Sequence, residues 1–194
     1  MGFGMRMAMR FGMMTLAMIG LAAAAQAEPL DGKSAKKALF ASVKAEVEIL
    51  PEAGLPKDQA LVLKSVGTAQ LYYGAIAISP EKGLMFETTV AAANYHDVAA
   101  ASAAALAGCN AAKRGKKDCV VAAVIRPKGW KVNGLSLSSD ATAGFKSEYK
   151  MAGSAMAISA ASGAWGIGVD GDAAIAACVA RNAAANDCAV VIAN

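Results

Sequence analysis

The single histidine of the chain is the strongest candidate for acid–base chemistry. His96 precedes Asp97, and a carboxylate beside an imidazole can orient the ring as a general base for a serine nucleophile. No Gly-x-Ser-x-Gly motif identifies such a serine. The alternative interpretation, which the sequence favours, is a polar residue just before a helix N-cap at Asp97. We therefore assign no catalytic residue.

Serine and lysine recur at the spacing used by penicillin-binding enzymes. Ser-x-x-Lys begins at Ser34, Ser79 and Ser147, but the companion Ser-Asp-Asn and Lys-Thr-Gly motifs are missing. Gly32-Lys33-Ser34 lacks the upstream glycine and the strand of a phosphate-binding loop. No lysine lies in a recognisable pyridoxal-phosphate motif, so the residues do not support a 5-aminolevulinate synthase, and no cofactor is expected.

The four cysteines form two pairs with the same spacing, because nine residues separate Cys109 from Cys119 and also Cys178 from Cys188. In an exported chain such cysteines predict disulfides. Gaps of this length do not fit a zinc site, where Cys-x2-Cys spacings are typical, so no metal is expected. Three pairings are open to four cysteines, and the repeat described next favours Cys109–Cys119 and Cys178–Cys188 over the crossed ones.

A repeated segment accounts for the equal spacing. Residues 75–83 (Ala-Ile-Ala-Ile-Ser-Pro-Glu-Lys-Gly) align with residues 155–163 (Ala-Met-Ala-Ile-Ser-Ala-Ala-Ser-Gly), and five of the nine positions are identical. In both copies the second cysteine follows an aspartate and leads into a valine-rich run. The chain therefore contains the same unit twice, and one disulfide inside each unit is the expected arrangement.

Each unit has the pattern strand–strand–helix–strand. The first predicts strands over 71–79, 84–90 and 119–125, a turn over 79–83, and a helix from an Asp97 cap to Gly108. The second predicts strands over 155–159, 164–169 and 188–193, with a helix capped by Asp172 that runs through Cys178. These patterns indicate an α+β fold in which alanine-rich helices pack on a mainly antiparallel sheet.

The flanking segments complete the predicted organisation. We expect helices over 34–41, 58–70 and 140–149, and strands over 43–50 and 135–137. The predicted divisions are a signal peptide (1–27), an N-terminal helix/strand extension (28–70) and a duplicated domain (71–194), made of unit one (71–127), a linker (128–153) and unit two (154–194).

The first 27 residues have the pattern of a cleavable secretory signal. Arg6 and Arg10 precede an uncharged stretch over 11–25, and Ala27 ends a small-x-small cleavage site before Glu28. Without the leader, 17 of the 19 basic residues remain against 15 acidic ones, so the charge gives no reason to expect a nucleic-acid partner. We expect a periplasmic or secreted protein with no transmembrane segment after cleavage.

Two further groups of residues are candidates for binding. The loop between the first two cysteines carries a basic cluster that could meet an anionic surface such as lipid A phosphates, although a solvated loop is the simpler interpretation: Lys113, Arg114, Lys116 and Lys117. Four aromatic residues could line a ligand groove, although core positions are more typical of them: Tyr72, Tyr73, Trp130 and Trp165.

The repeat resembles a family of bacterial exported proteins, the domain-of-unknown-function family 4189. The resemblance covers residues 72–194 and rests on Gly74-Ala75-Ile76-Ala77, Gly83, Cys109 and Cys119, with a partial second copy through Cys188. The family has no established activity, so the resemblance implies export and carries over no catalytic residue.

These observations together predict a non-catalytic binding or interaction module of the cell envelope. Its expected partner is an envelope protein or an anionic cell-surface component. The alternatives are a small periplasmic hydrolase that uses His96 and an inhibitor of another exported enzyme.

Overall fold

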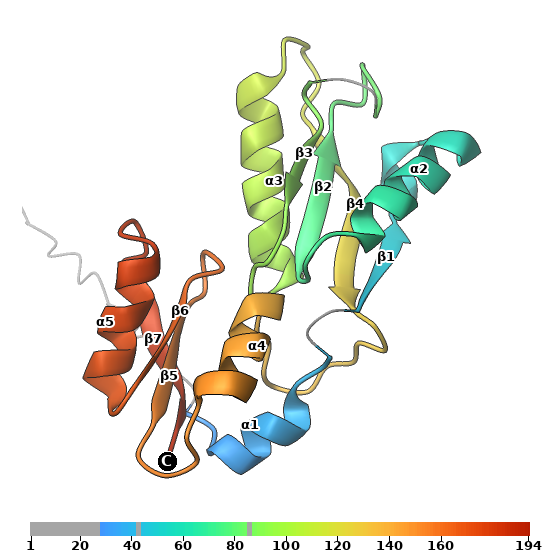
Figure 1. Cartoon of the computed structure of the whole chain (residues 1–194). Helices are drawn as coiled ribbons and strands as arrows, with labels where there is room; N and C mark the ends of the chain where they lie inside the picture. Colours follow the sequence, from blue (N-terminus) through green and yellow to red (C-terminus); the bar gives the residue numbers. More distant parts are fainter. Residues whose placement is uncertain (1–27, 42–43, 85–86) are drawn as a thin grey trace, which may run out of the picture.

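The structure, a computed structural model, describes residues 28–41, 44–84 and 87–194, so the predicted signal peptide lies outside the described residues. The α+β class and the antiparallel pairing are confirmed. The strands form two separate antiparallel sheets, one of four strands and one of three. Figure 1 shows that each unit has its own sheet and that a helix of the linker lies between the two.

The larger sheet has the strand order β1-β4-β2-β3 and combines three strands of unit one with β1 of the N-terminal extension. Its strands are β1 (Ala45–Ile49), β2 (Gly74–Ile78), β3 (Val90–Ala92) and β4 (Val120–Pro127). Ala75 and Ala77 of β2 pack against the alanine-rich helix α3 (Val98–Ala112), which small side chains allow to approach closely. Ile76 and Ile78 point to the opposite face and pack with Leu63 of α2 (Lys57–Thr68).

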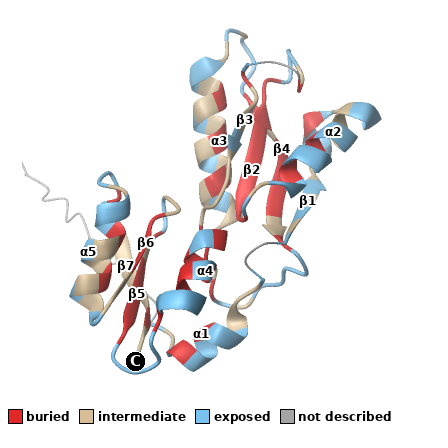
Figure 2. Ribbon diagram, in the orientation of Figure 1, coloured by how far each residue is buried: buried red, intermediate tan, exposed pale blue. Residues whose placement is uncertain are grey.

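Unit two contains the smaller sheet, with the strand order β6-β5-β7. Its strands are β5 (Ala155–Ser159), β6 (Trp165–Gly168) and β7 (Cys188–Ala193). Helix α5 (Gly171–Arg181) packs on the face that carries Ala155 and Ala157. The other face carries Met156 and Trp165 and is covered by α4 (Ser139–Glu148) and α1 (Gly32–Ala38). Figure 2 shows that burial is concentrated in the central strands β2 and β5.

The two units are structural repeats. Disulfides join Cys109 to Cys119 and Cys178 to Cys188, with Cα–Cα distances of 6.1 and 6.2 Å, so the pairing inside each unit is the one found. Each bridge links the helix of its unit to the start of the following strand. The register also shifts at equivalent positions, after Ile76 in β2 and after Met156 in β5.

Several local predictions were wrong. Of the described residues in the predicted strand at 84–90, only Val90 lies in a strand, where β3 begins. Thr89 Oγ1 donates instead to the Leu84 carbonyl (2.6 Å), a side-chain bond that competes with strand pairing. The predicted strand at 135–137 is unpaired loop. Asp170, not Asp172, caps α5, because its Oδ1 accepts from the Ala173 amide at 2.8 Å.

Helix α3 begins after Asp97 as predicted but continues through Gly108 to Ala112. Gly108 is therefore not a helix stop. Its position faces Val90 of β3, and an added Cβ would lie 3.0 Å from a methyl group of that side chain. The glycine therefore allows the helix to lie close to the sheet.

The N-terminal residues contribute to both units. Strand β1 pairs antiparallel with β4 at the edge of the larger sheet, while Leu30 forms a parallel bridge with Ile192 of the smaller one. Helix α1 then packs beside the smaller sheet and α2 beside the larger. Residues 28–70 thus complete the covering of both sheets.

Removing either disulfide should lower the free energy of unfolding by about 3 kcal/mol, since each bridge closes a short loop in the unfolded chain. We expect this loss for Cys109→Ser/Cys119→Ser and for Cys178→Ser/Cys188→Ser, measured by urea unfolding. Peptide mapping without reduction should recover two linked peptides, one from each unit. A peptide that links Cys109 to Cys178 or Cys188 would contradict the arrangement.

Candidate binding cleft between the units

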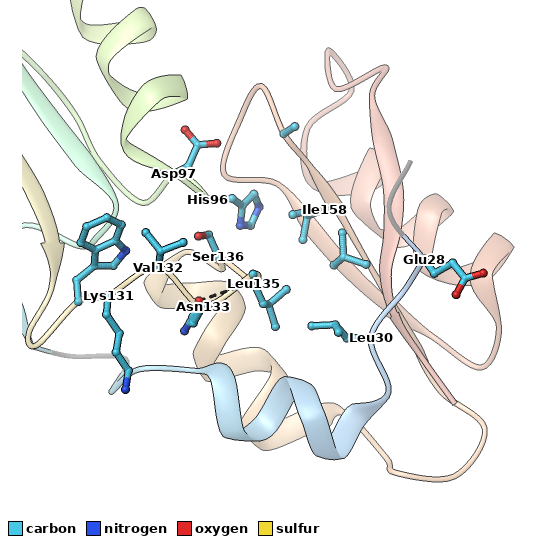
Figure 3. A pocket seen from close by; sticks show the side chains of 14 residues that line it. Glu28, Leu30, His96, Asp97, Lys131, Val132, Asn133, Leu135, Ser136 and Ile158 are labelled. Atoms are coloured by element: carbon cyan, nitrogen blue, oxygen red, sulfur yellow. Dashed lines mark hydrogen bonds between the residues drawn. The ribbon is translucent and has the colours of Figure 1, made fainter. Parts of the chain in front are cut away.

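A cleft of about 420 Å³ lies where the two units meet. One wall is the loop that follows β4, residues 130–136. The other is formed by the smaller sheet and by the segment around Leu30, which pairs with that sheet. Figure 3 shows His96 between these walls, with Ser136 and Val132 on one side and Ile158 on the other. The remaining lining residues come from four places in the chain: Glu28 and Leu30, Asp97, Ala160, and Val191.

The His96 ring joins three segments of the chain. It is only 2% exposed. The Ser138 amide donates to Nδ1 at 3.1 Å, so Nδ1 carries no proton and Nε2 carries the one proton of the neutral ring. Nε2 then donates to the Ala164 carbonyl at 2.9 Å. The imidazole therefore links unit one to the N-cap of α4 and to the β5–β6 hairpin of unit two.

The environment of His96 favours the neutral ring. Burial lowers its pKa below the usual 6.5, and the hydrogen bond to the Ala164 carbonyl and the carboxylates of Asp97 and Asp187 only partly oppose this effect. The ring also lies beside the N-termini of α3 and α4, whose dipoles disfavour a cation. A buried, uncharged imidazole is therefore the stable form at neutral pH.

This geometry does not provide a general base. Both ring nitrogens are engaged by backbone groups, so neither is free to take a proton from a serine. Asp97 does not orient the ring, because its Oδ1 accepts from the Ala100 amide at 2.7 Å and caps α3. The structure fits the interpretation of His96 as a polar residue before a helix N-cap.

A second contact beside His96 holds the same three segments together. Asn94, in the left-handed region at φ 65°, accepts from the Asp140 amide at 3.1 Å and donates to its carboxylate at 2.8 Å. The Asn94 carbonyl oxygen lies so close to Gly163 that a Cβ there would overlap it. Close approach of the hairpin to unit one therefore requires glycine at 163.

The cleft combines an apolar lining with few charges. Leu30, Leu135, Ile158 and Val191 provide apolar walls, while Val132 at the rim is 86% exposed. Exposed apolar side chains around a concave site are typical of binding surfaces. The charged side chains that line it are the carboxylates of Glu28 and Asp97 and the ammonium of Lys131.

Loop 130–136 is held in place by its own polar contacts. Asn133 donates from Nδ2 to the Ala38 carbonyl at the end of α1 and accepts from the Leu135 amide at 3.4 Å. The flanking glycines Gly129 and Gly134 have positive φ values of 72° and 79°. The sequence prediction did not identify this loop, although two glycines around a Trp-Lys-Val segment were a usable turn signal.

The four aromatic candidates separate into core and cleft residues. Tyr72 and Tyr73 are buried in the core of unit one, and Trp165 is buried beneath the Arg181 guanidinium, 3.5 Å from the ring centroid. Trp130 lines the cleft and is 40% exposed. The Arg126 guanidinium lies 4.9 Å from its ring centroid, which helps to fix the ring. The aromatic groove prediction therefore applies to Trp130 alone.

The other sequence candidates lie outside the cleft. Ser34 donates to Asp31 at 2.6 Å, Ser147 donates to the Ala143 carbonyl, and Ser79 is buried. Of residues 28–41, 44–84 and 87–194, no three His, Cys, Asp or Glu side chains gather where they could hold a metal ion.

The basic loop follows the far end of α3. This helix has 15 residues, so the loop is about 22 Å from the cleft end of α3. Lys113 forms an ion pair with Asp118, and the Lys117 amide donates to Glu81 at 3.3 Å. Arg114, Lys116 and Lys117 are exposed. Anion binding by this loop stays a prediction.

Comparison of the chain with family models, curated proteins and solved structures found no significant match. The resemblance to family 4189 therefore stays a prediction.

Within the described part of the chain, every helix is too short or too polar to cross a membrane.

Replacing His96 with alanine should lower the free energy of unfolding by about 3 kcal/mol, because the Ser138 amide and the Ala164 carbonyl lose their buried partner. His96→Gln, whose amide can still donate toward Ala164, should lose clearly less. Urea unfolding at pH 7.5 measures both variants, and equal losses would show that the hydrogen bonds do not matter.

Gly163→Ala should destabilise the protein by about 1–3 kcal/mol, because the new methyl group overlaps the Asn94 carbonyl. Gly171→Ala is the matched control, since its Cβ would lie 3.3 Å from a movable Val190 methyl group. Thermal unfolding of the two variants compares them, and an unchanged Gly163→Ala midpoint would refute the close contact between units.

Proposed function

We propose that this protein is a non-catalytic binding module of the cell envelope that holds a small amphipathic ligand in the cleft between its units. The observation that carries the proposal is an apolar cleft whose rim exposes Val132 and Trp130 to solvent. A single exposed aliphatic residue is ordinary on a protein surface, but here both residues border one cavity.

The size and walls of the cleft support a small molecule. Its volume of about 420 Å³ lies within the range of ligand sites, roughly 300–1,000 Å³. The wall around Ile158 belongs to a sheet that a disulfide joins to its helix, and the opposite wall is anchored through Asn133. A site built on such braced elements loses little conformational entropy when it binds.

The lining favours a ligand with an apolar body and a polar end. Ile158 and Val191 contact such a body, while Asp97 and Lys131 offer charges of both signs. One oxygen of Asp97, Oδ1, caps α3, and the carboxylate can still accept a further donor. Binding is supported over hydrolysis because both nitrogens of His96 are already engaged.

The envelope location rests on the leader sequence and the disulfides. Two disulfides are compatible with an exported protein, since they persist in an oxidising compartment. The predicted cleavage after Ala27 would place the new N-terminus at Glu28, beside the cleft.

The proposal is tested with 1-anilinonaphthalene-8-sulfonate, a fluorescent amphipathic probe. The mature chain should bind it at one site. Ala160→Trp, which places an indole in the cleft, should weaken binding by about tenfold or more, equivalent to 1.4 kcal/mol. Ala161→Trp is the matched control, because Ala161 is also exposed but does not line the cleft.

Equal probe affinity in both tryptophan variants would refute the cleft as the binding site. Mass spectrometry of the protein purified from its native host then gives the natural ligand. A released small molecule that is present in wild type and in Ala161→Trp, but absent from Ala160→Trp, is the expected result.

A further inference from the structure

We infer that protonation of His96 breaks its hydrogen bond with the Ser138 amide and so opens the structure locally, where the cleft wall of loop 130–136 meets α4, at acidic pH. The release of ligand that this implies rests on the proposed function, whereas the opening itself does not. The inference stands on the placement of one buried ring between backbone groups of two other segments.

The two hydrogen bonds of the ring respond differently to a proton. The imidazolium still donates from Nε2 to the Ala164 carbonyl. A proton on Nδ1, however, would face the Ser138 amide hydrogen, so two donors would meet at 3.1 Å. Ser138 is completely buried, so no water molecule can replace the ring as the acceptor for its amide. Protonation therefore breaks the contact on the Ser138 side.

This broken contact lies at one end of the cleft wall. Leu137 separates Ser138 from residues 130–136, and Ser138 also caps α4, where its Oγ accepts from the Ala141 amide at 3.2 Å. The wall has a second anchor at Asn133, which bonds to the end of α1. The residues that follow Ser138 keep their bonds to unit one, since the Ser139 amide donates to the Tyr72 carbonyl at 2.9 Å and Asp140 bonds to Asn94. Loss of the His96 contact therefore opens the structure locally at Ser138 and leaves the wall attached at both ends.

The charged groups around the ring come from several elements. Asp97 belongs to the start of α3, and Asp187 precedes β7; both carboxylates favour the imidazolium. Asp140 lies in the first turn of α4 with its carboxylate bonded to Asn94. Lys131 and Glu28 line the cleft that the ring borders. Burial is the largest effect on the pKa of His96 and acts in the opposite direction to the Ala164 hydrogen bond and to the carboxylates of Asp97 and Asp187.

The sign of the pH dependence follows from linkage. In the closed state the pKa of His96 is lowered from 6.5, while an open state exposes the ring to water and restores its affinity for protons. The closed state therefore loses stability relative to the open state as pH falls below 6.5. The loss is complete once the pH is below the lowered pKa.

Because the chain has one histidine, NMR can follow it without ambiguity. The mature wild-type chain is titrated from pH 7.5 to pH 4.5 while ring signals and amide hydrogen exchange are recorded. The ring should begin as the neutral tautomer protonated at Nε2. Exchange of the Ser138 amide, corrected for its intrinsic pH dependence, should accelerate by about tenfold or more with the same midpoint as the ring.

His96→Gln is the control, because its side chain retains a donor but does not titrate in this range. Corrected exchange at Ser138 should not change with pH in this variant. A wild-type Ser138 amide that stays protected throughout the ring titration would overturn the inference, as would the same acceleration in His96→Gln. If the variant does not fold, a wild-type exchange midpoint that differs from the ring midpoint overturns it.

Probe affinity, measured on the same samples, separates this inference from the proposed function. Opening accompanied by weaker binding of 1-anilinonaphthalene-8-sulfonate supports both. Opening with unchanged probe affinity supports the effect of His96 protonation at Ser138 and refutes the implied release of ligand, while Ala160→Trp tests the cleft separately. Weaker binding without accelerated exchange at Ser138 refutes that effect and leaves the cleft as the binding site.

Discussion

The neutral imidazole of His96 determines how the two halves of this protein are joined. A neutral ring offers one donor and one acceptor, and here each is used by a backbone group far away in sequence, 68 and 42 residues distant. An apolar side chain could make neither bond, and a charged ring would lose one of them. These two bonds help to set the position of α4 relative to both sheets, and His96 also lines the cleft.

The cleft follows from how a repeated unit covers its sheet. In each unit the helix that belongs to the repeat packs on the alanine face of the central strand, around Ala75 or Ala155. The opposite face, with its larger side chains, must be covered from outside the repeat. In unit one α2 does this, and in unit two α4 and α1 do so less completely. Ile158 is left at the edge of that cover and becomes part of the cleft wall.

The two copies have kept their backbone plan while their polar contacts have diverged. In unit two Asp187 accepts from Ser159 Oγ at 2.6 Å and from the Ala161 amide at 2.8 Å, which closes the hairpin onto the start of β7. The equivalent Asp118 pairs with Lys113 instead, and the Ser79 hydroxyl is buried without a hydrogen-bond partner in the described part of the chain. The shared backbone plan explains why the disulfide pairing could be predicted from the repeat.

The amino-acid sequence by itself determined the repeat, the cysteine pairing, the α+β class and the capping of α3 by Asp97, because these depend on local spacing and on residues close in the chain. The candidate site was not predictable in this way. Its walls come from 28–30, 96–97, 130–136, 158–160 and 191, and no periodicity connects segments so far apart. Only the tertiary structure decided that His96 joins the units rather than activating a serine, because its role is set by Ser138 and Ala164, two backbone groups whose proximity no side-chain pattern encodes.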